Sequence, residues 1–225
     1  VLAEMEAFGF RGEGIVLSNP IDTRTFRPLP RRKAAKARYG FTDATAIYAG
    51  RLAHEKHIDV LLRAVARARS EVPRLMLALA GGGPEERPLR TLAARLGILS
   101  AVRFLGILDK PALAEAYNAS ELFTITSTSE TQSLTMMQAL SCGLPVVAVR
   151  ARALPEYINR RNGVLVPPGD AALLAREIVR LIKHPQARKT LGMGARKSAQ
   201  AFSPPHIAEA WERLYQRAIG AHRHS

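Results

Sequence analysis

The stretch 44-ATAIYAGRLAHEKHIDVLLRAVARARSEVPRLMLALAGGG-83 decides the fold of this chain. It holds two apolar runs, residues 44–50 and 74–81, without the polar alternation of a half-exposed strand, which is typical of strands buried on both faces. Between them, residues 57–72 have the spacing of an amphipathic helix. A strand, a helix and a second strand in this order predict a parallel βαβ unit.

The same alternation continues after this stretch. Further apolar runs predict strands at residues 101–106, 121–127, 145–150 and 163–168, and amphipathic patterns predict helices at residues 85–98, 111–120, 133–143, 170–184, 186–202 and 205–223. We therefore predict an α/β fold in which a Rossmann-like parallel sheet carries helices on both faces. Residues 28–33, PLPRRK, are predicted to be the loop that leads into this sheet.

The composition of the 225 residues is that of a globular protein with a sizeable core, since 47% are hydrophobic and 23% are charged. No apolar run reaches the roughly 20 residues of a membrane-spanning helix, and residues 1–10 lack the pattern of a secretion signal. The single cysteine, Cys142, excludes an internal disulfide and a multi-cysteine metal site, so we expect a reducing, cytoplasmic location. Because the first residue is Val, we expect a piece of a longer protein.

The formal net charge of +14 and the pI near 10.8 indicate a polyanionic partner or surface, unless they only reflect an Ala/Arg-rich composition. Nucleic acid is the less favoured partner, because only 6% of the residues are aromatic and the chain has no RNP-like, zinc-finger or helix-turn-helix pattern. Basic clusters at residues 24–38, 150–161 and 176–189 favour an anionic membrane surface. We therefore expect a cytoplasmic protein that is peripheral to the cytoplasmic face of the membrane.

Ligands of an open α/β sheet bind beyond the carboxyl ends of its strands, so the residues after each predicted strand are candidates for a site. Glycines there allow a ligand to approach the backbone, cations supply fixed positive charge, and the helix that opens near Ser133 offers N–H groups. The residues concerned are Gly50, Arg51, Lys56, Gly81 to Gly83, Leu105, Gly106, Ser127 to Glu130 and Arg150 to Arg152. Together they predict a site for a phosphate-bearing anion, such as a nucleotide or a phosphosugar.

Each of these features also has a simpler interpretation. GGGPE (81–85) fits a tight turn between a strand and a helix, and GRLAHEK (50–56) fits a solvated loop. Residues 129–132, SETQ, fit the capping-box pattern at the start of a helix. Only their convergence on one edge of the sheet favours a ligand site.

Several segments, in this order and with this spacing, resemble the carboxyl-terminal, donor-binding domain of retaining GT-B glycosyltransferases of the family 4 type. These segments are VLSNPIDTRTFRP (16–28), IYAGRLAHEKHIDVLLRA (47–64), MLALAGGGPEE (76–86), RFLGIL (103–108), STSETQSLTMMQALSCGLPVVA (127–148) and NGVLVPPGD (162–170). The likeness covers nearly the whole chain. The SETQ string also resembles diacylglycerol glucosyltransferases and related lipid-directed members.

The resemblance implies a hexosyltransferase that takes its sugar from a UDP-sugar or a GDP-sugar, with retention of configuration and without a metal or another cofactor. Arg51 and Lys56 would hold the diphosphate and stabilise the leaving group, and Glu130 would contact hydroxyls of the transferred sugar. Further donor contacts are implied for Gly50, Gly82, Gly83, Leu105, Gly106, Thr131, Gln132, Ser133, Leu134 and Gln138, with residues 103–108 lining the base pocket. The chain contains no D-x-D motif for a metal.

Three positions depart from the family pattern. Gln138 stands eight positions after Glu130, where the family usually has a second glutamate that contacts the ribose. We expect a neutral amide there to lower donor affinity by on the order of 1 kcal/mol, unless another residue takes over this contact. Pro20 replaces a glycine of the first motif. RARALPE (150–156) replaces a glycine-rich loop, so no sugar or phosphate contact is assigned to Glu156.

The resemblance also implies a domain organisation. Residues 1–204 would form the donor-binding domain, and residues 205–225 a terminal helix that crosses to an amino-terminal acceptor domain, unless Trp211, Leu214 and Tyr215 pack this helix onto the sheet. We expect the isolated chain to bind the donor but to transfer sugar slowly or not at all. Two alternatives stay open: a GT-B enzyme of another reaction type, such as a phosphorylase or an epimerase, and a non-catalytic nucleotide-sugar or anion-binding module.

Overall fold

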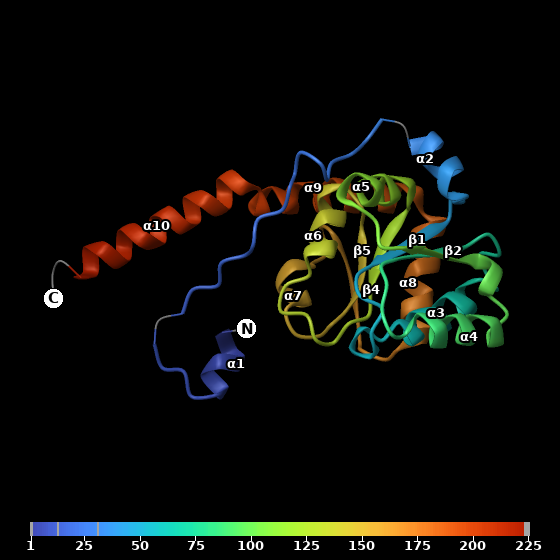
Figure 1. Ribbon diagram of the computed structural model, residues 1–225, viewed down its shortest axis with the longest axis horizontal. Helices are drawn as coiled ribbons and strands as arrows, with labels where there is room; N and C mark the ends of the chain where they lie inside the picture. The colour runs from blue at the N-terminus through green and yellow to red at the C-terminus, as the bar shows by residue number, and fades with distance from the viewer. Residues whose placement is uncertain (1, 13, 31, 223–225) are drawn as a thin grey trace.

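The computed structural model describes residues 2–12, 14–30 and 32–222, which contain a sheet of six parallel strands in the order β3-β2-β1-β4-β5-β6 (Figure 1). The strand order reverses direction between β1 and β4. The strands are β1 (Thr45–Ala49), β2 (Met76–Ala80), β3 (Val102–Gly106), β4 (Leu122–Ile125), β5 (Val146–Val149) and β6 (Gly163–Val166). All of them lie within the ranges predicted from the sequence, and the predicted fold class is confirmed.

Helices cover both faces of this sheet. On one face α3 (Ile58–Ala68) packs against α4 (Glu86–Arg95) and α8 (Ala171–Lys183). On the other face lie α5 (Lys110–Ala119), against which α2 (Arg32–Tyr39) packs, and α6 (Leu134–Ser141), against which α9 (Pro185–Ala199) packs. None of the helices in the described ranges combines the length and the apolar character that crossing a bilayer requires.

The core explains why the strand patterns lack polar alternation. Every residue of β1, β2, β4 and β5 is buried, because helices cover these strands from both sides. In α3, the fully buried Leu61, Leu62 and Val65 recur at the spacing of one helix face. The edge strand β3, by contrast, has partly exposed positions.

Local patterns in the sequence do not predict three of the short helices, α1 (Leu2–Ala7), α2 and α7 (Leu154–Tyr157). The prediction of a loop over residues 28–33 is wrong at its carboxyl end, because α2 begins at Arg32. Residues 32–38 are all Arg, Lys or Ala, which are strong helix formers. The segment lacks the apolar periodicity from which the other helices were predicted, since Ala35 is its buried residue.

The last helix, α10 (Pro204–His222), extends away from the sheet (Figure 1). The rings of Trp211 and Tyr215 stack with their centroids 5.8 Å apart, yet the two residues are 42% and 61% exposed. Ile219, one turn further along the same face, is 55% exposed. The interpretation in which this helix packs onto the sheet is therefore wrong.

Candidate functional site

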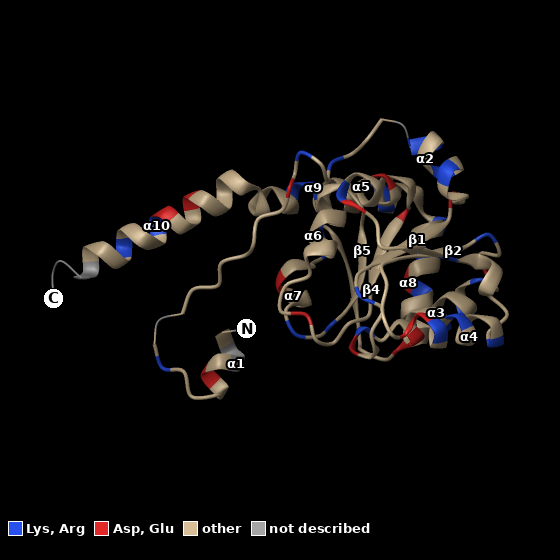
Figure 2. Cartoon of the chain, in the orientation of Figure 1, with Lys and Arg blue, Asp and Glu red and all other residues tan. Residues whose placement is uncertain are grey.

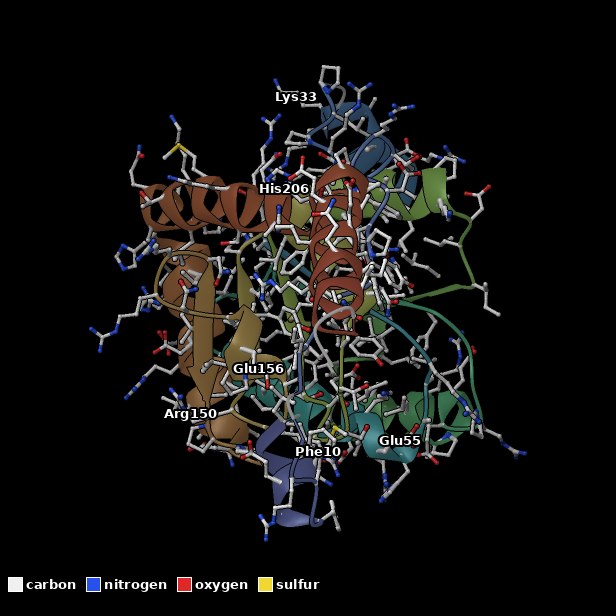
Figure 3. The ribbon with its side chains drawn as sticks, turned by 90° about the vertical axis from the view of Figure 1, so that its left-hand side faces the viewer. Phe10, Lys33, Glu55, Arg150, Glu156 and His206 are labelled. Atoms are coloured by element: carbon white, nitrogen blue, oxygen red, sulfur yellow. The ribbon has the colours of Figure 1, made fainter. Side chains whose placement is uncertain are left out.

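The candidate site lies where the strand order reverses, beyond the carboxyl ends of β1 and β4. Residues 50–57 follow β1, and residues 126–133 follow β4. Ligands of open α/β sheets bind in the crevice at such a reversal. Figure 3 shows Glu55, from the loop after β1, in the lower part of the view and Lys33, from α2, at the opposite end of the molecule.

An ion pair joins the two loops at this edge. Nζ of Lys56 donates to Oε1 of Glu130 at 2.7 Å, although the two residues are 74 positions apart in the sequence. Their side chains are 19% and 13% exposed, so water screens the pair only in part. The fold thus places side by side a cation suited to phosphate and a carboxylate suited to sugar hydroxyls, both singled out from the sequence.

Two further hydrogen bonds hold the loops together. Oγ1 of Thr126 donates to the carbonyl oxygen of Lys56 at 2.9 Å, and Nε2 of His57 lies 3.0 Å from Oγ1 of Thr128. His57 adopts a left-handed conformation with φ 48°, which ends the 3-10 turn His54–Lys56 and begins α3. Sequence reasoning missed Thr126, His57 and Thr128, because no pattern in the chain indicates which loop side chains meet.

Arg51 lies in the same loop as Lys56, with its backbone held by Tyr48. The Tyr48 hydroxyl donates to the carbonyl oxygen of Arg51 at 3.0 Å. Burial raises the pKa of the Tyr48 phenol well above its ordinary value, and the carboxylates of Glu130 and Glu55 raise it further. The phenol therefore stays a neutral donor at physiological pH, while the Arg51 side chain is exposed to any anion that enters the site.

A pocket of about 320 Å³ opens beside this loop. It is lined by Ala49, Gly50, Arg51, Ala80, Gly81, Gly82, Ile107, Leu108, Leu113 and Thr135. Gly50, Arg51 and Gly82 are thus brought together as predicted, whereas Leu105 and Gly106 do not form part of the wall. The segment 103–108, predicted to line a base pocket, contributes only its last two residues, and Lys56 and Glu130 lie outside the wall.

Gly83 is required by the close approach of two turns. A Cβ atom at this position would overlap the carbonyl oxygen of Leu52. The turns are tied together, since the Leu52 N–H donates to the Gly82 carbonyl and the Glu85 N–H donates to the Leu52 carbonyl, both at 3.0 Å. At Gly82, by contrast, a Cβ atom would meet only the Ile107 side chain, with Cγ1 at 3.5 Å and Cδ1 at 3.7 Å, which are ordinary contacts.

We therefore expect Gly83→Ala and Gly82→Ala, although adjacent, to differ sharply in stability. Gly83→Ala should lower the free energy of unfolding by about 3 kcal/mol, because a fixed backbone atom must move to admit the methyl group. Gly82→Ala should change it by less than about 1 kcal/mol. Urea denaturation of both variants measures the difference. Equal stability of the two variants would contradict the close approach.

Residues 129–132 do not form the capping box at the start of α6. Ser133 is the N-cap, and its Oγ accepts the Met136 N–H at 3.4 Å. Gln132 instead binds the segment before the sheet, since its Oε1 accepts from the backbone N–H of Asn19 at 3.1 Å and from Asn19 Nδ2 at 2.7 Å. The capping-box interpretation is therefore wrong, because Ser133 lies nearer the helix and Gln132 is engaged elsewhere.

Thr131, Leu134 and Gln138 complete the set of residues predicted for this site. Thr131 and Leu134 are exposed at the turn into α6, close in the chain to Glu130. Oε1 of Gln138 is buried and accepts no hydrogen bond from any residue within the described ranges. A buried acceptor without a partner costs about 1–3 kcal/mol.

The loop after β5 reaches the site through its backbone. The Ala153 N–H donates to the carbonyl oxygen of Glu130 at 3.3 Å. Arg152 adopts φ 44°, a left-handed conformation that glycine takes more readily, so residues 150–156 form this turn at some conformational cost. Across the part of the chain that the structure covers, no three His, Cys, Asp or Glu side chains are grouped so as to hold a metal ion.

The chain is similar in sequence to known glycosyltransferases. A family model described as Glycosyl transferases group 1 matches residues 32–198. The chain is 34% identical over 229 residues to a D-inositol 3-phosphate glycosyltransferase of Streptomyces bingchenggensis, and 35% identical over 219 residues to one of Saccharomonospora viridis. These matches cover 96% and 92% of the chain but 50% and 51% of the relatives, so the chain spans about half their length.

Solved structures give the same assignment. Sucrose-phosphate synthase from Thermosynechococcus elongatus superposes with a TM-score of 0.86 and 28% identity, covering 98% of this chain and 56% of that one. HepE of Anabaena, solved in complex with UDP, superposes with a TM-score of 0.87 and 25% identity, covering 96% and 61%. These neighbours are GT-B transferases, and the sheet described above is one Rossmann-like half of that fold. The chain therefore belongs to the glycosyl transferases group 1 family.

Proposed function

We propose that this chain binds the nucleotide-sugar donor of a hexosyltransferase, at the edge of the sheet between β1 and β4. The observation that carries the proposal is the ion pair of Lys56 and Glu130, 2.7 Å apart at the reversal of strand order. Family membership supports the reaction class. HepE supports the ligand, because that protein has been solved with UDP and with UDP-glucose at 25% and 26% identity to this chain.

In the proposed site, positive charge stabilises the leaving group. Cleavage of the bond between the sugar and the phosphate builds negative charge on the departing nucleoside diphosphate. Arg51 and Lys56 are fixed cations at this edge, and the backbone N–H groups of residues 131–134 supply further donors in the proposal. These groups would neutralise the developing charge without a metal ion, and transfer with retention of configuration follows from the family resemblance.

The pocket beside Arg51 is proposed to hold the base of the donor. Its wall combines the backbone of Gly50 and Gly82 with the apolar side chains of Ile107 and Leu108, which suits a planar ring better than a charged group. Arg51, at the border of this pocket, would then meet the diphosphate. UDP-sugars are the first choice of donor on account of HepE, with GDP-sugars as the alternative.

If Glu130 binds the sugar, Glu130→Gln should change the affinity for UDP-glucose differently from the affinity for UDP. We expect binding of UDP-glucose to weaken about tenfold, because a hydrogen bond to a charged group contributes about 1.5 kcal/mol. Binding of UDP alone should stay equal or tighten, because Lys56 loses its carboxylate partner and gains freedom to meet the diphosphate. Calorimetric titration measures both constants, and Glu55→Gln, an exposed glutamate in the neighbouring loop, is the control.

Loss of both affinities in Glu130→Gln, or of neither, would contradict the sugar contact. Urea denaturation of the same samples shows whether the substitution lowers the stability of the fold. The control variant is expected to bind both ligands as the parent chain does, because Glu55 is an exposed residue of the 3-10 turn His54–Lys56.

Gln138→Glu should strengthen donor binding. Oε1 of Gln138 is a buried acceptor without a partner in the described ranges, and a carboxylate would offer two equivalent acceptors to the ribose hydroxyls. We expect UDP to bind about fivefold more tightly, which corresponds to roughly 1 kcal/mol. Titration with UDP measures the change. Weaker binding of UDP by Gln138→Glu would contradict a contact between this residue and the ribose.

We further propose that this half of the GT-B fold works with an amino-terminal acceptor domain. The exposed faces of Trp211, Tyr215 and Ile219 on α10 support this arrangement, because a stacked aromatic pair in solvent is typical of a surface that binds another part of a protein. The isolated chain should therefore bind donor without efficient transfer. Full turnover by the isolated chain, measured as release of UDP from UDP-glucose with an acceptor present, would contradict it.

A non-catalytic module that has lost donor binding is the second candidate. The observations that favour it are Gln138 in place of glutamate and the strained turn at Arg152. The two candidates differ in a direct test, because only a working donor site loses its affinity for a nucleotide-sugar when Arg51 or Lys56 is replaced.

A further inference from the structure

A second pocket, of about 560 Å³, lies at the opposite edge of the sheet. It is formed by Pro28, Leu29 and Arg32, by the end of α5 with the residues that lead into β4, by the turn between α6 and β5, and by the first turns of α9. Glu121, which lines it, directly precedes β4, whereas Glu130 of the donor site follows the same strand. The two sites are therefore at opposite ends of β4 and share no residue.

The charge of this pocket is strongly positive. Arg32, Arg188, Lys189 and Arg196 line it, and Glu121 is the one acidic side chain in its described wall, so the wall carries an excess of three positive charges. Figure 2 shows basic residues on α2, on the side of the molecule where α5 and α9 lie. A concave surface of one charge sign attracts ions of the opposite sign and holds them near its wall.

Glu121 pairs with only some of the cations around this pocket. Its side chain is 8% exposed, and its Oε1 lies 2.6 Å from both Arg32 Nη2 and Lys36 Nζ. Its Oε2 lies 3.2 Å from Nη2 of Arg188. One carboxylate thus faces three cations from two elements, while Lys189 and Arg196 add charge that Glu121 does not contact.

Two further features of the wall suit an anion. Helix α9 begins at the pocket with Pro185, and its N-cap residue, His184, gives no side-chain hydrogen bond to the first-turn N–H groups. Burial raises the pKa of the Cys142 thiol to about 12, so this group adds no negative charge at physiological pH.

We propose that this pocket is a second anion site, which binds a phosphate-bearing ligand independently of the nucleotide-sugar. Guanidinium groups match the geometry of a phosphate, and four cations around a cavity exceed what one carboxylate can pair. The phosphate has two possible sources, a free phosphorylated metabolite and the headgroup of an anionic lipid. The site does not depend on the proposed donor function, because none of its residues belongs to the donor site.

The test uses the full chain with Arg51→Ala and Lys56→Ala, which removes the cations of the donor site. Inorganic pyrophosphate is titrated into this background by calorimetry. We expect binding that weakens at least tenfold on adding Lys189→Glu and Arg196→Glu, two exposed residues that make no ion pair with Glu121. The matched control, Arg87→Glu with Arg95→Glu on α4, changes the net charge equally and should leave the affinity unchanged.

The two sources are separated by co-sedimentation with vesicles of phosphatidylglycerol and of phosphatidylcholine. Binding to phosphatidylglycerol vesicles that pyrophosphate displaces, and that the α9 substitutions abolish, assigns the pocket to a lipid headgroup. Binding of pyrophosphate without binding to vesicles assigns it to a free phosphate ester. Absence of pyrophosphate binding in this background, or an equal loss in the α4 control, would overturn the proposal. A chain that carries only Lys189→Glu and Arg196→Glu is titrated with UDP-glucose as well. This titration tests the donor site separately from the second anion site.

Discussion

Lys56→Ala is expected to weaken the binding of UDP-glucose by roughly ten- to hundredfold, since a hydrogen bond to a charged group contributes about 1.5–3 kcal/mol. The loss has two parts. The cation that meets the diphosphate is removed, and the carboxylate of Glu130, which is 13% exposed and paired with Lys56 at 2.7 Å, is left without its partner near the negative ligand. The effect should therefore exceed that of losing an isolated surface lysine.

A matched control shows whether the loss comes from the position of Lys56 or only from the removal of one positive charge. Lys183, on α8, also pairs with a glutamate, since its Nζ lies 2.8 Å from Oε2 of Glu71, but the two side chains are 48% and 58% exposed. Lys183→Ala should leave the affinity for UDP-glucose unchanged. Equal affinity of Lys56→Ala and the parent chain would remove Lys56 from the site.

Glu121→Ala is expected to give the largest loss of stability among the carboxylate substitutions proposed for this protein. Its carboxylate is 8% exposed and contacts Arg32, Lys36 and Arg188, so it ties α2, the start of β4 and α9 together. Removing one partner of a buried charge cluster leaves the remaining charges uncompensated. The free energy of unfolding should fall by about 3–5 kcal/mol.

Glu115→Ala is the control for this change. Glu115 pairs with Arg38 at 2.8 Å, but the two side chains are 27% and 67% exposed, and surface ion pairs contribute about 1 kcal/mol or less. Urea denaturation of the two variants at the same ionic strength compares them directly. Losses of unfolding free energy of similar size in the two variants would show that Glu121 does not stabilise the packing of α2, β4 and α9.

The strands were predictable because strands that are buried on both faces are uninterrupted apolar runs in the sequence. Each of β1, β2, β4 and β5 is an apolar run with every residue buried. Helix α2 was not predictable in the same way, because its stabilising contacts come from α5 and from Glu121, which lie far away in the chain. Periodicity in one segment carries no information about such partners.

The candidate site was predictable in its location and only partly in its details. The rule that ligands bind beyond strand ends selects Arg51, Lys56 and Glu130 from the amino-acid sequence alone. The contact between Lys56 and Glu130 lies beside the left-handed His57 and the hydrogen bond from Thr126 to the Lys56 carbonyl, and neither feature has a sequence pattern. Likewise, the apolar face of α10 is visible in the sequence, but its direction away from the sheet is not.

The proposal that the chain carries a donor site is tested most directly by calorimetric titration with UDP-glucose, UDP-galactose, UDP-N-acetylglucosamine and GDP-mannose. The parent chain, Arg51→Ala and Lys56→Ala are titrated in parallel, and each is shown to be folded by its urea transition. We predict that the parent chain binds one of these donors selectively and that both variants lose this binding. A folded parent chain that binds none of the four donors, or variants that bind as the parent does, would contradict a donor site at this edge of the sheet.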